Sequence, residues 1–341
     1  MIRTAACLFL LLLSHAVLAA DCDATRRAAV DGVFDAFATH QVVLFGEQHQ
    51  RKEFHEFLRT LIRDRRFTRT VTQIVVEFGN ARYQDVADRY VAGREVPRSE
   101  MQHVWRDVVG TLLGFDSPVY EEFYDTVREV NRERPADERI RVILGDPPVP
   151  WSEVHDAAAY GRYIERDQFM TDAIQHARKD GRRVLVIVGG LHIPLTARPE
   201  TMPKHPGVGD LLESAAPHSA YRIFSTPPAL RPDFDCAPQL LSASGELGDR
   251  SFGVLMEPGV MVQHTVDGQP KWVKMTDSDW PPVRAKIDAA LYLGPTHTRV
   301  DPLPSTLADT AYIRELHRRA KIMHDFFGFD FESDLPPAPP E

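Results

Sequence analysis

Short apolar runs alternate with amphipathic segments through the first two-thirds of the chain. Runs rich in aliphatic and β-branched residues are typical of buried strands, and they occur at residues 42–45, 71–77, 139–144 and 183–188. Between the first two runs, residues 51–64 carry apolar side chains every three or four positions, which predicts a helix with one buried face. Strands that alternate with helices favour an α/β fold, with a mostly parallel central sheet and helices on both faces.

The rest of the pattern predicts further helices and a less regular second half. Most of the 26 prolines lie after residue 194, so the C-terminal part is expected to be rich in loops. We expect one α/β domain over residues 21–330, with two domains as the alternative, and a disordered Pro-rich tail over residues 331–341. Helical spacing recurs at residues 25–39, 81–91, 99–113, 120–131, 160–179 and 311–327, and strands are expected at 220–224 and 289–293 with a hairpin over 260–273.

Residues 1–20 have the pattern of a secretory signal peptide, with Arg3, then an apolar block over residues 5–13, then small residues ending at Ala20. The alternative is a membrane anchor, but the apolar block is shorter than the ~20 residues that span a bilayer. Asp21 precedes Cys22 where a lipoprotein signal has a small residue, so we do not expect a lipid anchor. The sequence therefore predicts an exported protein, periplasmic or extracellular, without an integral membrane segment in its mature chain.

The net charge and the cysteines limit which partners and which covalent links are expected. The net charge is −9, and removal of Arg3 with the signal peptide takes it to −10, which disfavours a nucleic-acid partner. Cys7 leaves with the signal peptide, so Cys22 and Cys236 remain. In an oxidising compartment two cysteines most simply form one disulfide, and two unpaired thiols are the alternative.

Candidate catalytic residues follow the predicted strands. Glu47 and His49 come after the first strand, and His192 follows the fourth strand in a similar Gly-containing turn. Glu77 ends the second strand and Asp146 ends the third. Because parallel strands place their carboxyl ends at one edge of the sheet, we expect these side chains to share a site. Carboxylates and imidazoles together can bind a divalent metal or act as an acid and a base on water.

Each of these residues alone also has a purely structural interpretation. Glu77 can cap a helix or pair with an arginine, and His49 can lie on the surface at a helix start. Asp146 precedes two prolines and can be a turn residue, while His192 can hydrogen-bond a loop. As a set at strand ends, they favour a functional site.

Two further positions complete the candidate set. Arg166 is expected to bind an anionic group and Asp167 to bond a neighbouring loop, with a surface ion pair as the alternative. Together with Asp146, they are assigned to substrate binding. His55 lies off the apolar stripe of its helix, which predicts an exposed side chain.

No Gly-x-Ser-x-Gly turn and no phosphate-binding Gly-rich loop occur, so an ordinary serine hydrolase and a P-loop nucleotide-binding protein are disfavoured.

The order of these motifs resembles a known superfamily, the erythromycin esterase-like, ChaN-like and Tiki-like proteins. The resemblance covers roughly residues 40–226, with a further similar run at 288–294. It implies an α/β fold whose acids and histidines cluster at one end of the sheet. The matching stretches are Leu44–Phe–Gly–Glu–Gln–His49, Val75–Val–Glu77, Arg166–Asp–Gln–Phe–Met170 and Val188–Gly–Gly–Leu–His192.

The resemblance implies three activities. Esterase-like members use a histidine to activate water against a lactone, Tiki-like members resemble metal-dependent proteases, and ChaN-like members bind haem. By motif position, Glu47, His49, Glu77 and His192 match the catalytic or metal-site residues. The implied cofactor is a divalent metal (Mn, Co or Zn), which these four residues would hold, or haem.

The leading hypothesis is an exported hydrolase that acts on an ester, a lactone or a peptide. His49 would be the base that activates water, and Glu47 and Glu77 would orient the water or bind a metal. His192 would stabilise the developing oxyanion or supply a further metal ligand. The alternatives are a haem- or iron-binding protein without turnover, and a catalytically silent domain that binds a partner.

Overall fold

The computed structural model describes residues 22–193, 206–231, 236–256, 259, 261–267, 269–333 and 335–339. The signal peptide expected over residues 1–20 lies outside the described residues, so its cleavage and export remain predictions. Within the described part of the chain, no helix is both long enough and apolar enough to cross a membrane.

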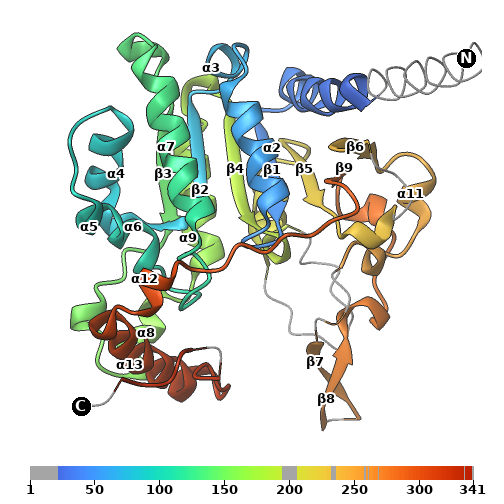
Figure 1. The fold of residues 1–341 in the computed structure, drawn as a ribbon. Coiled ribbons are helices and arrows are strands. Elements are labelled where there is room, and N and C mark those ends of the chain that lie inside the picture. The colour runs from blue at the N-terminus through green and yellow to red at the C-terminus, as the bar shows by residue number, and fades with distance from the viewer. Residues whose placement is uncertain are drawn as a thin grey trace, which may run out of the picture.

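A seven-stranded sheet forms the centre of the described molecule, in the order β3-β2-β4-β1-β5-β9-β6 (Figure 1). All neighbouring strands run parallel except β6, which pairs antiparallel with β9 at the edge. The predicted α/β fold with a mostly parallel sheet is therefore confirmed. The strands are β1 (Val42–Glu47), β2 (Gln73–Asn80), β3 (Arg141–Asp146), β4 (Val184–Gly189), β5 (Ala220–Ser225), β6 (Gln239–Ser242) and β9 (Ala289–Tyr292).

Helices cover both faces of this sheet because successive side chains of a strand point to opposite faces. Val43 and Phe45 of β1 belong to one core cluster, and Val42 and Leu44 belong to the other. The helix over residues 22–39, α2 (Lys52–Arg63), α4 (Gln84–Val91) and α7 (Pro118–Arg132) pack in the first cluster, and α9 (Arg166–Ala177) and α10 (Val208–Ala215) pack in the second. This two-sided burial explains why the central strands read as continuous apolar runs.

The strand order places a crevice at the carboxyl ends of the central strands. The chain runs from β1 to β2, two positions away, and β4 later fills the position between them. β5 then lies on the other side of β1, so the chain leaves β1 and β4 toward opposite edges. Such a switch in direction is where open α/β sheets bind their ligands. In Figure 1 the carboxyl ends lie at the lower edge of the sheet, near α13 and the hairpin of β7 (Met261–Val266) and β8 (Gln269–Lys274).

Two long helices predicted from spacing are shorter in the structure. The helix predicted over residues 99–113 is interrupted: α5 (Arg98–Met101) and α6 (His103–Arg106) are followed by a loop over residues 107–117. The chain does not continue as a helix here because Val109 donates its N–H to the buried carboxylate of Asp146 instead of to a helical carbonyl. The helix predicted over 160–179 is α9, which begins at Arg166. The remaining short helices are α3 (Phe67–Thr70), α8 (Ala157–Tyr160), α11 (Glu246–Asp249) and α12 (Pro304–Leu307).

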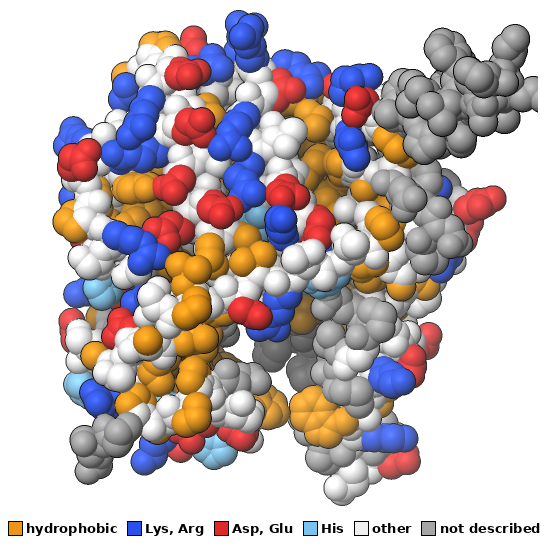
Figure 2. All heavy atoms as spheres, viewed as in Figure 1, with side chains coloured by type: hydrophobic (Ala, Val, Ile, Leu, Met, Phe, Trp, Pro, Cys, Tyr) orange, Lys and Arg blue, Asp and Glu red, His pale blue; other side chains and the backbone are white. Residues whose placement is uncertain are grey.

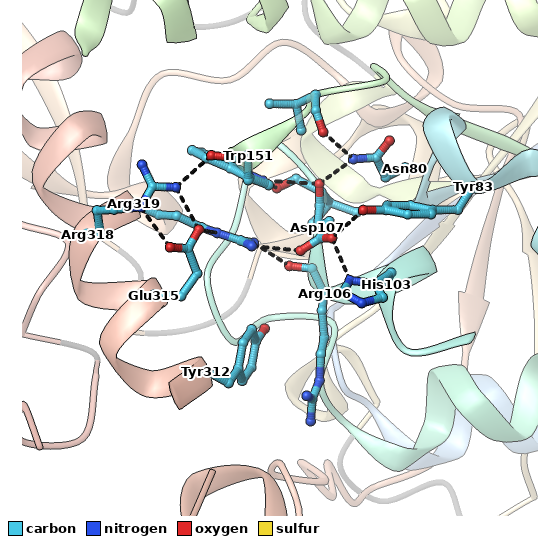
Figure 3. Close-up of polar contacts among 12 residues, drawn as sticks. Asn80, Tyr83, His103, Arg106, Asp107, Trp151, Tyr312, Glu315, Arg318 and Arg319 are labelled. Atoms are coloured by element: carbon cyan, nitrogen blue, oxygen red, sulfur yellow. Dashed lines mark hydrogen bonds and ion pairs between the residues drawn. The ribbon is translucent and has the colours of Figure 1, made fainter. Parts of the chain in front are cut away.

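The C-terminal helix α13 (Thr310–Phe327) anchors the loop over residues 107–117 (Figure 3). The guanidinium of Arg319 pairs with Asp107 at 2.7 Å and donates to the carbonyl of Arg106 at 2.8 Å. The hydroxyl of Tyr312 donates to Asp116 at 2.7 Å, near the end of the same loop. A helix from the far end of the sequence therefore fixes a loop that reaches the carboxyl edge of the sheet.

A disulfide and the tail tie the two ends of the described chain to the domain. Cys22 and Cys236, 214 residues apart in sequence, form a disulfide, which joins the first helix to the segment before β6. In the tail predicted to be disordered, Phe331 and Leu335 pack against the cluster formed by α13. Residues 334, 340 and 341 lie outside the described residues.

Candidate functional site

The carboxyl ends of β1, β2 and β4 line one pocket with a volume of about 550 Å³. Its wall includes Glu47 and His49 after β1, Glu77 on β2, and His192 just after β4. Arg166, at the start of α9, completes the polar part of the wall. The structure therefore brings together the four residues that the sequence placed at strand ends in separate parts of the chain.

Glu47 is a buried carboxylate surrounded by donors. Its Oε1 accepts a hydrogen bond from Nδ1 of His49 at 2.8 Å and another from the hydroxyl of Tyr120 at 3.1 Å. Its Oε2 lies 3.1 Å from Nε2 of His55. Burial alone raises the pKa of Glu47, but the contacts with His49 and His55 outweigh it and lower the pKa to about 2. The carboxylate is therefore ionised at neutral pH and can only accept.

His49 is oriented by that carboxylate. Because Nδ1 must donate to Glu47, the other ring nitrogen, Nε2, is the atom that can accept a proton. Among the described residues no hydrogen bond or ion pair engages Nε2, and the side chain is 42% exposed and lines the pocket. Burial opposes protonation, but Glu47 and Glu77 together raise the pKa of His49 above its ordinary 6.5. The ring edge packs on Phe115 at 5.1 Å between centroids.

Glu77 is held by a guanidinium and a main-chain donor. Nη2 of Arg166 donates to Oε1 of Glu77 at 2.9 Å, and Gly189 donates its N–H to Oε2. Nε of Arg166 donates to Oδ1 of Asp146 at 2.6 Å. Burial alone raises the pKa of Glu77, but His192 and Arg166 bring it well below its usual range. Asp146 is fully buried, and its pKa is raised to about 6 by that burial despite Arg166.

His192 is held on both sides by carboxylates. Its Nε2 lies 3.2 Å from Oε1 of Glu77, and its Nδ1 lies 2.6 Å from Oδ1 of Asp167. Burial lowers the pKa of this imidazole, but Glu77 and Asp167 raise it to about 9. His192 is therefore an imidazolium at neutral pH with both N–H groups in use. Asp167 also accepts from the N–H of Val208, the first residue of α10, at 3.1 Å.

Gly189 lies where the two histidine regions meet. A Cβ at this position would lie 2.8 Å from Nε2 of His49 and 3.1 Å from Oε2 of Glu77. Only glycine allows the imidazole and the carboxylate to approach the end of β4 this closely. The first glycine of the Gly–Gly sequence before His192 therefore also leaves space for the side chains of His49 and Glu77.

Arg166 and Asp146 have different places from those expected. The interpretation of Arg166 as part of a surface ion pair is wrong, because its side chain is 14% exposed and holds two buried carboxylates. Asp146 does not line the pocket but lies behind it, where it fixes Arg166 and Val109. Asp167 lines an adjoining pocket, with Leu191 and His192.

His55 was predicted to be exposed, and that prediction is wrong: its side chain is fully buried. The ring packs against Phe78 and Tyr120 while it faces Glu47. The sequence contained a signal for it, because His55 and Leu58 share a spacing of three that continues the apolar face of α2. The contact of Tyr120 with Glu47 was not predicted, because Tyr120 lies on the buried face of α7, where an aromatic residue indicates only packing. Both residues are explained by the need of a buried carboxylate for donors.

The described part of the pocket contains an imidazole with a free ring nitrogen, that of His49, and no cluster of candidate metal ligands. In the described ranges, no group of three or more His, Cys, Asp or Glu side chains is arranged to hold a metal ion. The reason is local: His192 has both nitrogens engaged, and Glu77 is occupied by Arg166. The assignment of Glu47, His49, Glu77 and His192 as metal ligands stays a prediction. For haem, Nε2 of His49 faces a pocket whose wall also includes Phe224, Leu255, Met256 and Met275.

The fold and the site can now be compared with those of known proteins. The arrangement is that of an α/β protein with acids and imidazoles at the carboxyl edge of its sheet. Residues 33–134 match the family model described as haem-binding uptake, Tiki superfamily, ChaN. This match confirms the predicted resemblance to the superfamily. It includes Glu47, His49 and Glu77 and ends before His192.

One of the solved structures found has the same fold at low sequence identity, and others give lower TM-scores. A succinoglycan biosynthesis protein superposes with a TM-score of 0.53 at 10% identity, over 76% of this chain and 89% of that chain. A protein from Bacillus cereus gives a TM-score of 0.47 at 12% identity, over 76% and 90% of the two chains. The type III effector HopBA1 gives a TM-score of 0.38 at 11% identity, over 61% and 85%. No curated protein matches the chain.

Proposed function

We propose that this protein is an exported hydrolase in which His49 activates a water molecule against an ester, lactone or peptide carbonyl. The observation that carries the proposal is the Glu47–His49 pair: Nδ1 is bonded to an ionised carboxylate, and the ring, whose Nε2 has no partner among the described residues, lines the pocket. A carboxylate that fixes the tautomer of a histidine and stabilises its protonated form is the arrangement that general-base catalysis requires.

The proposed reaction uses the two states of His49 in turn. Nε2 takes a proton from water as the water oxygen forms a bond to the carbonyl carbon. Glu47 stabilises the resulting imidazolium through Nδ1, without taking up the proton itself. When the bond to the leaving group breaks, the imidazolium returns the proton to the leaving oxygen or nitrogen. Water is consumed, and the products are a carboxylic acid and an alcohol or amine.

In this proposal Arg166, rather than His192, lies near the developing oxyanion. His192 directs both N–H groups at carboxylates, so it has no donor left for a substrate oxygen. Arg166 uses Nε and Nη2 on Asp146 and Glu77, while its Nη1 lies against Gly110 in the pocket wall. A guanidinium fixed by two carboxylates is a preorganised positive charge, which favours an oxyanion over a neutral carbonyl.

The experiment is a panel of esters, lactones and peptides, assayed with a chelator and with added Mn, Co or Zn. We expect turnover by the wild-type protein and a loss of at least about a thousandfold in His49→Ala, with the thermal midpoint within a few degrees. His176→Ala, which removes an exposed histidine of α9, is the matched control and should retain full turnover. Full turnover by His49→Ala would overturn the proposal. Loss of turnover on chelation would assign a metal to the mechanism.

Haem binding is the second candidate function, favoured by the family match and by the orientation of His49. Nε2 of a histidine is a common axial ligand of haem iron, and its hydrogen-bonded Nδ1 is the usual arrangement. Titration with hemin should then produce a shifted Soret band that His49→Ala removes and His176→Ala retains. A titration without a shift, or a shift that survives in His49→Ala, would contradict this function.

A further inference from the structure

An apolar groove continues from the candidate pocket toward the C-terminal helix. It has a volume of about 260 Å³ and shares Gly110 and Arg166 with the pocket that contains His49. The other residues that line the groove are Val109, Tyr160, Ile164, Met323, Phe327, Phe329 and Phe331. Arg166 is the one charged residue in this lining, and it lies at the junction with the pocket, while the remaining side chains are apolar or aromatic. The groove is therefore suited to an uncharged, apolar group.

The end of α13 builds the aromatic wall of the groove. Gly328 adopts a φ of 74°, a left-handed conformation that ends the helix and reverses the chain. The turn is held by His324, whose Nδ1 lies 2.8 Å from the carbonyl oxygen of Phe329. Phe327 then packs against Tyr160 and Phe331, with ring centroids 6.0 Å apart in each pair. The groove thus depends on a segment far outside the region that matches the family model.

Half of the large hydrophobic side chains that are exposed among the described residues lie at this groove and pocket. Among the described residues, the large hydrophobic side chains that remain exposed include Phe327 (42%), Phe329 (45%) and Leu191 (43%). Phe327 and Phe329 line the groove, and Leu191 lines the pocket beside it. Figure 2 shows hydrophobic side chains gathered over the α12–α13 region, next to the hollow that separates it from the β7–β8 side. Exposed apolar side chains beside a groove and a pocket are typical of a binding site.

We propose that the groove binds an apolar chain attached to the scissile bond, so that the substrate is an ester with an extended apolar group. The inference rests on the proposed function, because it assumes that the bond is broken beside His49. It adds the substrate class: the junction at Gly110 and Arg166 lets one molecule place its carbonyl in the pocket and its chain along Phe327 and Phe329. Phe329 is then a specificity-determining residue.

The test compares esters that differ only in chain length. One series varies the acyl group, from p-nitrophenyl acetate to p-nitrophenyl octanoate, and the other varies the alcohol, from methyl acetate to octyl acetate. A half-open apolar groove should raise kcat/KM at least about tenfold between the shortest and longest member of one series. In Phe329→Ala that ratio should fall at least about threefold, and Phe329→Leu should restore most of it.

Leu307→Ala is the matched control, since Leu307 is 39% exposed but lines neither the groove nor the pocket. It should leave the chain-length ratio unchanged. Circular dichroism and the thermal midpoint of each variant show whether it folds. If both series give flat profiles in the wild-type protein, or if Phe329→Ala and Leu307→Ala behave alike, the inference is overturned while hydrolysis stands.

A binding measurement separates failure of the groove from failure of the proposed function. Octanoate and butanoate are titrated calorimetrically into the wild-type protein, Phe329→Ala and His49→Ala. We expect octanoate to bind at least about tenfold more tightly than butanoate in the wild-type protein and in His49→Ala, and less so in Phe329→Ala. If that pattern holds without any turnover, the groove stands as an apolar binding site and the hydrolase proposal fails. Equal affinities for the two acids would overturn the groove.

Discussion

The two histidines of the site follow similar strand–glycine turns but have opposite surroundings. His49 has one carboxylate partner, through Nδ1, and its Nε2 faces the pocket. His192 has two carboxylate partners, one for each ring nitrogen. The first arrangement leaves an atom that can take up a proton. The second yields an imidazolium that already holds both of its protons.

The difference shows that the motif delivers an imidazole, while the neighbouring acids decide its role. Glu47 orients His49, and in the proposed reaction it keeps this histidine able to exchange a proton with water. Glu77 and Asp167 fix His192, which in turn helps to fix Glu77 beside Gly189. His192 is therefore a positioning residue for the carboxylate side of the pocket. Each prediction below tests this division between a reactive and a supporting histidine.

The largest effect is expected from Glu47→Gln. A glutamine cannot stabilise the imidazolium of His49, and its amide group can favour the wrong tautomer. We expect kcat/KM to fall by about a thousandfold, chiefly in kcat, with little change in KM. Steady-state kinetics on the best ester of the panel measure it. A fall confined to KM would assign Glu47 to substrate binding and contradict the role of an orienting carboxylate.

Gly189→Ala tests the close approach of the two regions. A Cβ 2.8 Å from Nε2 of His49 must displace the imidazole or the end of β4. A displacement of this size should reduce kcat/KM by about a hundredfold. Gly245→Ala is the matched control, because a Cβ there meets only a carbonyl oxygen of Ser242 at 4.0 Å. Equal rates in both variants would show that His49 does not act from its present position.

His192→Gln should reduce stability more clearly than it reduces turnover. The substitution removes the charged donor shared by two carboxylates, which should cost about 1–3 kcal/mol in the free energy of unfolding. Urea denaturation measures it, with His218→Gln, whose side chain is 90% exposed, as a control within about 0.5 kcal/mol of the wild type. Loss of turnover comparable to that of His49→Ala, at unchanged stability, would contradict the supporting role.

The same substitution has a pH signature. Because the pKa of His192 is raised from 6.5 to about 9 in the folded protein, its contribution to stability is fully present below pH 6.5. It is lost as the pH rises through 9. The stability difference between the wild-type protein and His192→Gln should therefore shrink between these two values. If this stability difference grew with pH, the folded protein would favour the neutral form of His192, which would contradict the account.

The smallest effect is the position of the acid limb of the pH–rate profile. Glu47 and Glu77 raise the pKa of His49 above 6.5, so the neutral base is lost below a pH higher than that value. We expect kcat/KM to fall about tenfold per pH unit on this limb. An acid limb near pH 4 would identify a carboxylate as the base. The pH–rate profile of the wild-type protein between pH 4 and 9 decides this.

Much of the fold was predictable because buried parallel strands give continuous apolar runs and one-sided helices give a clear period. β6 was missed because a four-residue strand paired only at the sheet edge gives no such run. The prediction of one helix over residues 99–113 was wrong because long-range hydrogen bonds override the local spacing of apolar residues. Val109 donates its N–H to Asp146, and Arg319 donates to the carboxylate of Asp107. Such contacts join distant parts of the chain, and no local pattern contains them.

The candidate site was predictable once the strands were placed, because the ends of parallel strands share one edge of the sheet. The sequence could not assign the two histidines, because their partners come from different elements. Asp167, which engages His192, lies on α9, and Tyr120, which supports Glu47, lies on α7. His55 was misplaced because its helix buries a wider face than its apolar side chains indicate.

The division of roles is tested most directly by ¹⁵N NMR titration of the two imidazoles, assigned with His49→Gln and His192→Gln. The account predicts that His49 titrates above pH 6.5 and that its neutral form keeps the proton on Nδ1, with Nε2 unprotonated. It predicts that His192 stays doubly protonated through neutral pH and loses a proton only near pH 9. A neutral His192 at pH 7, or a neutral His49 with the proton on Nε2, would contradict it.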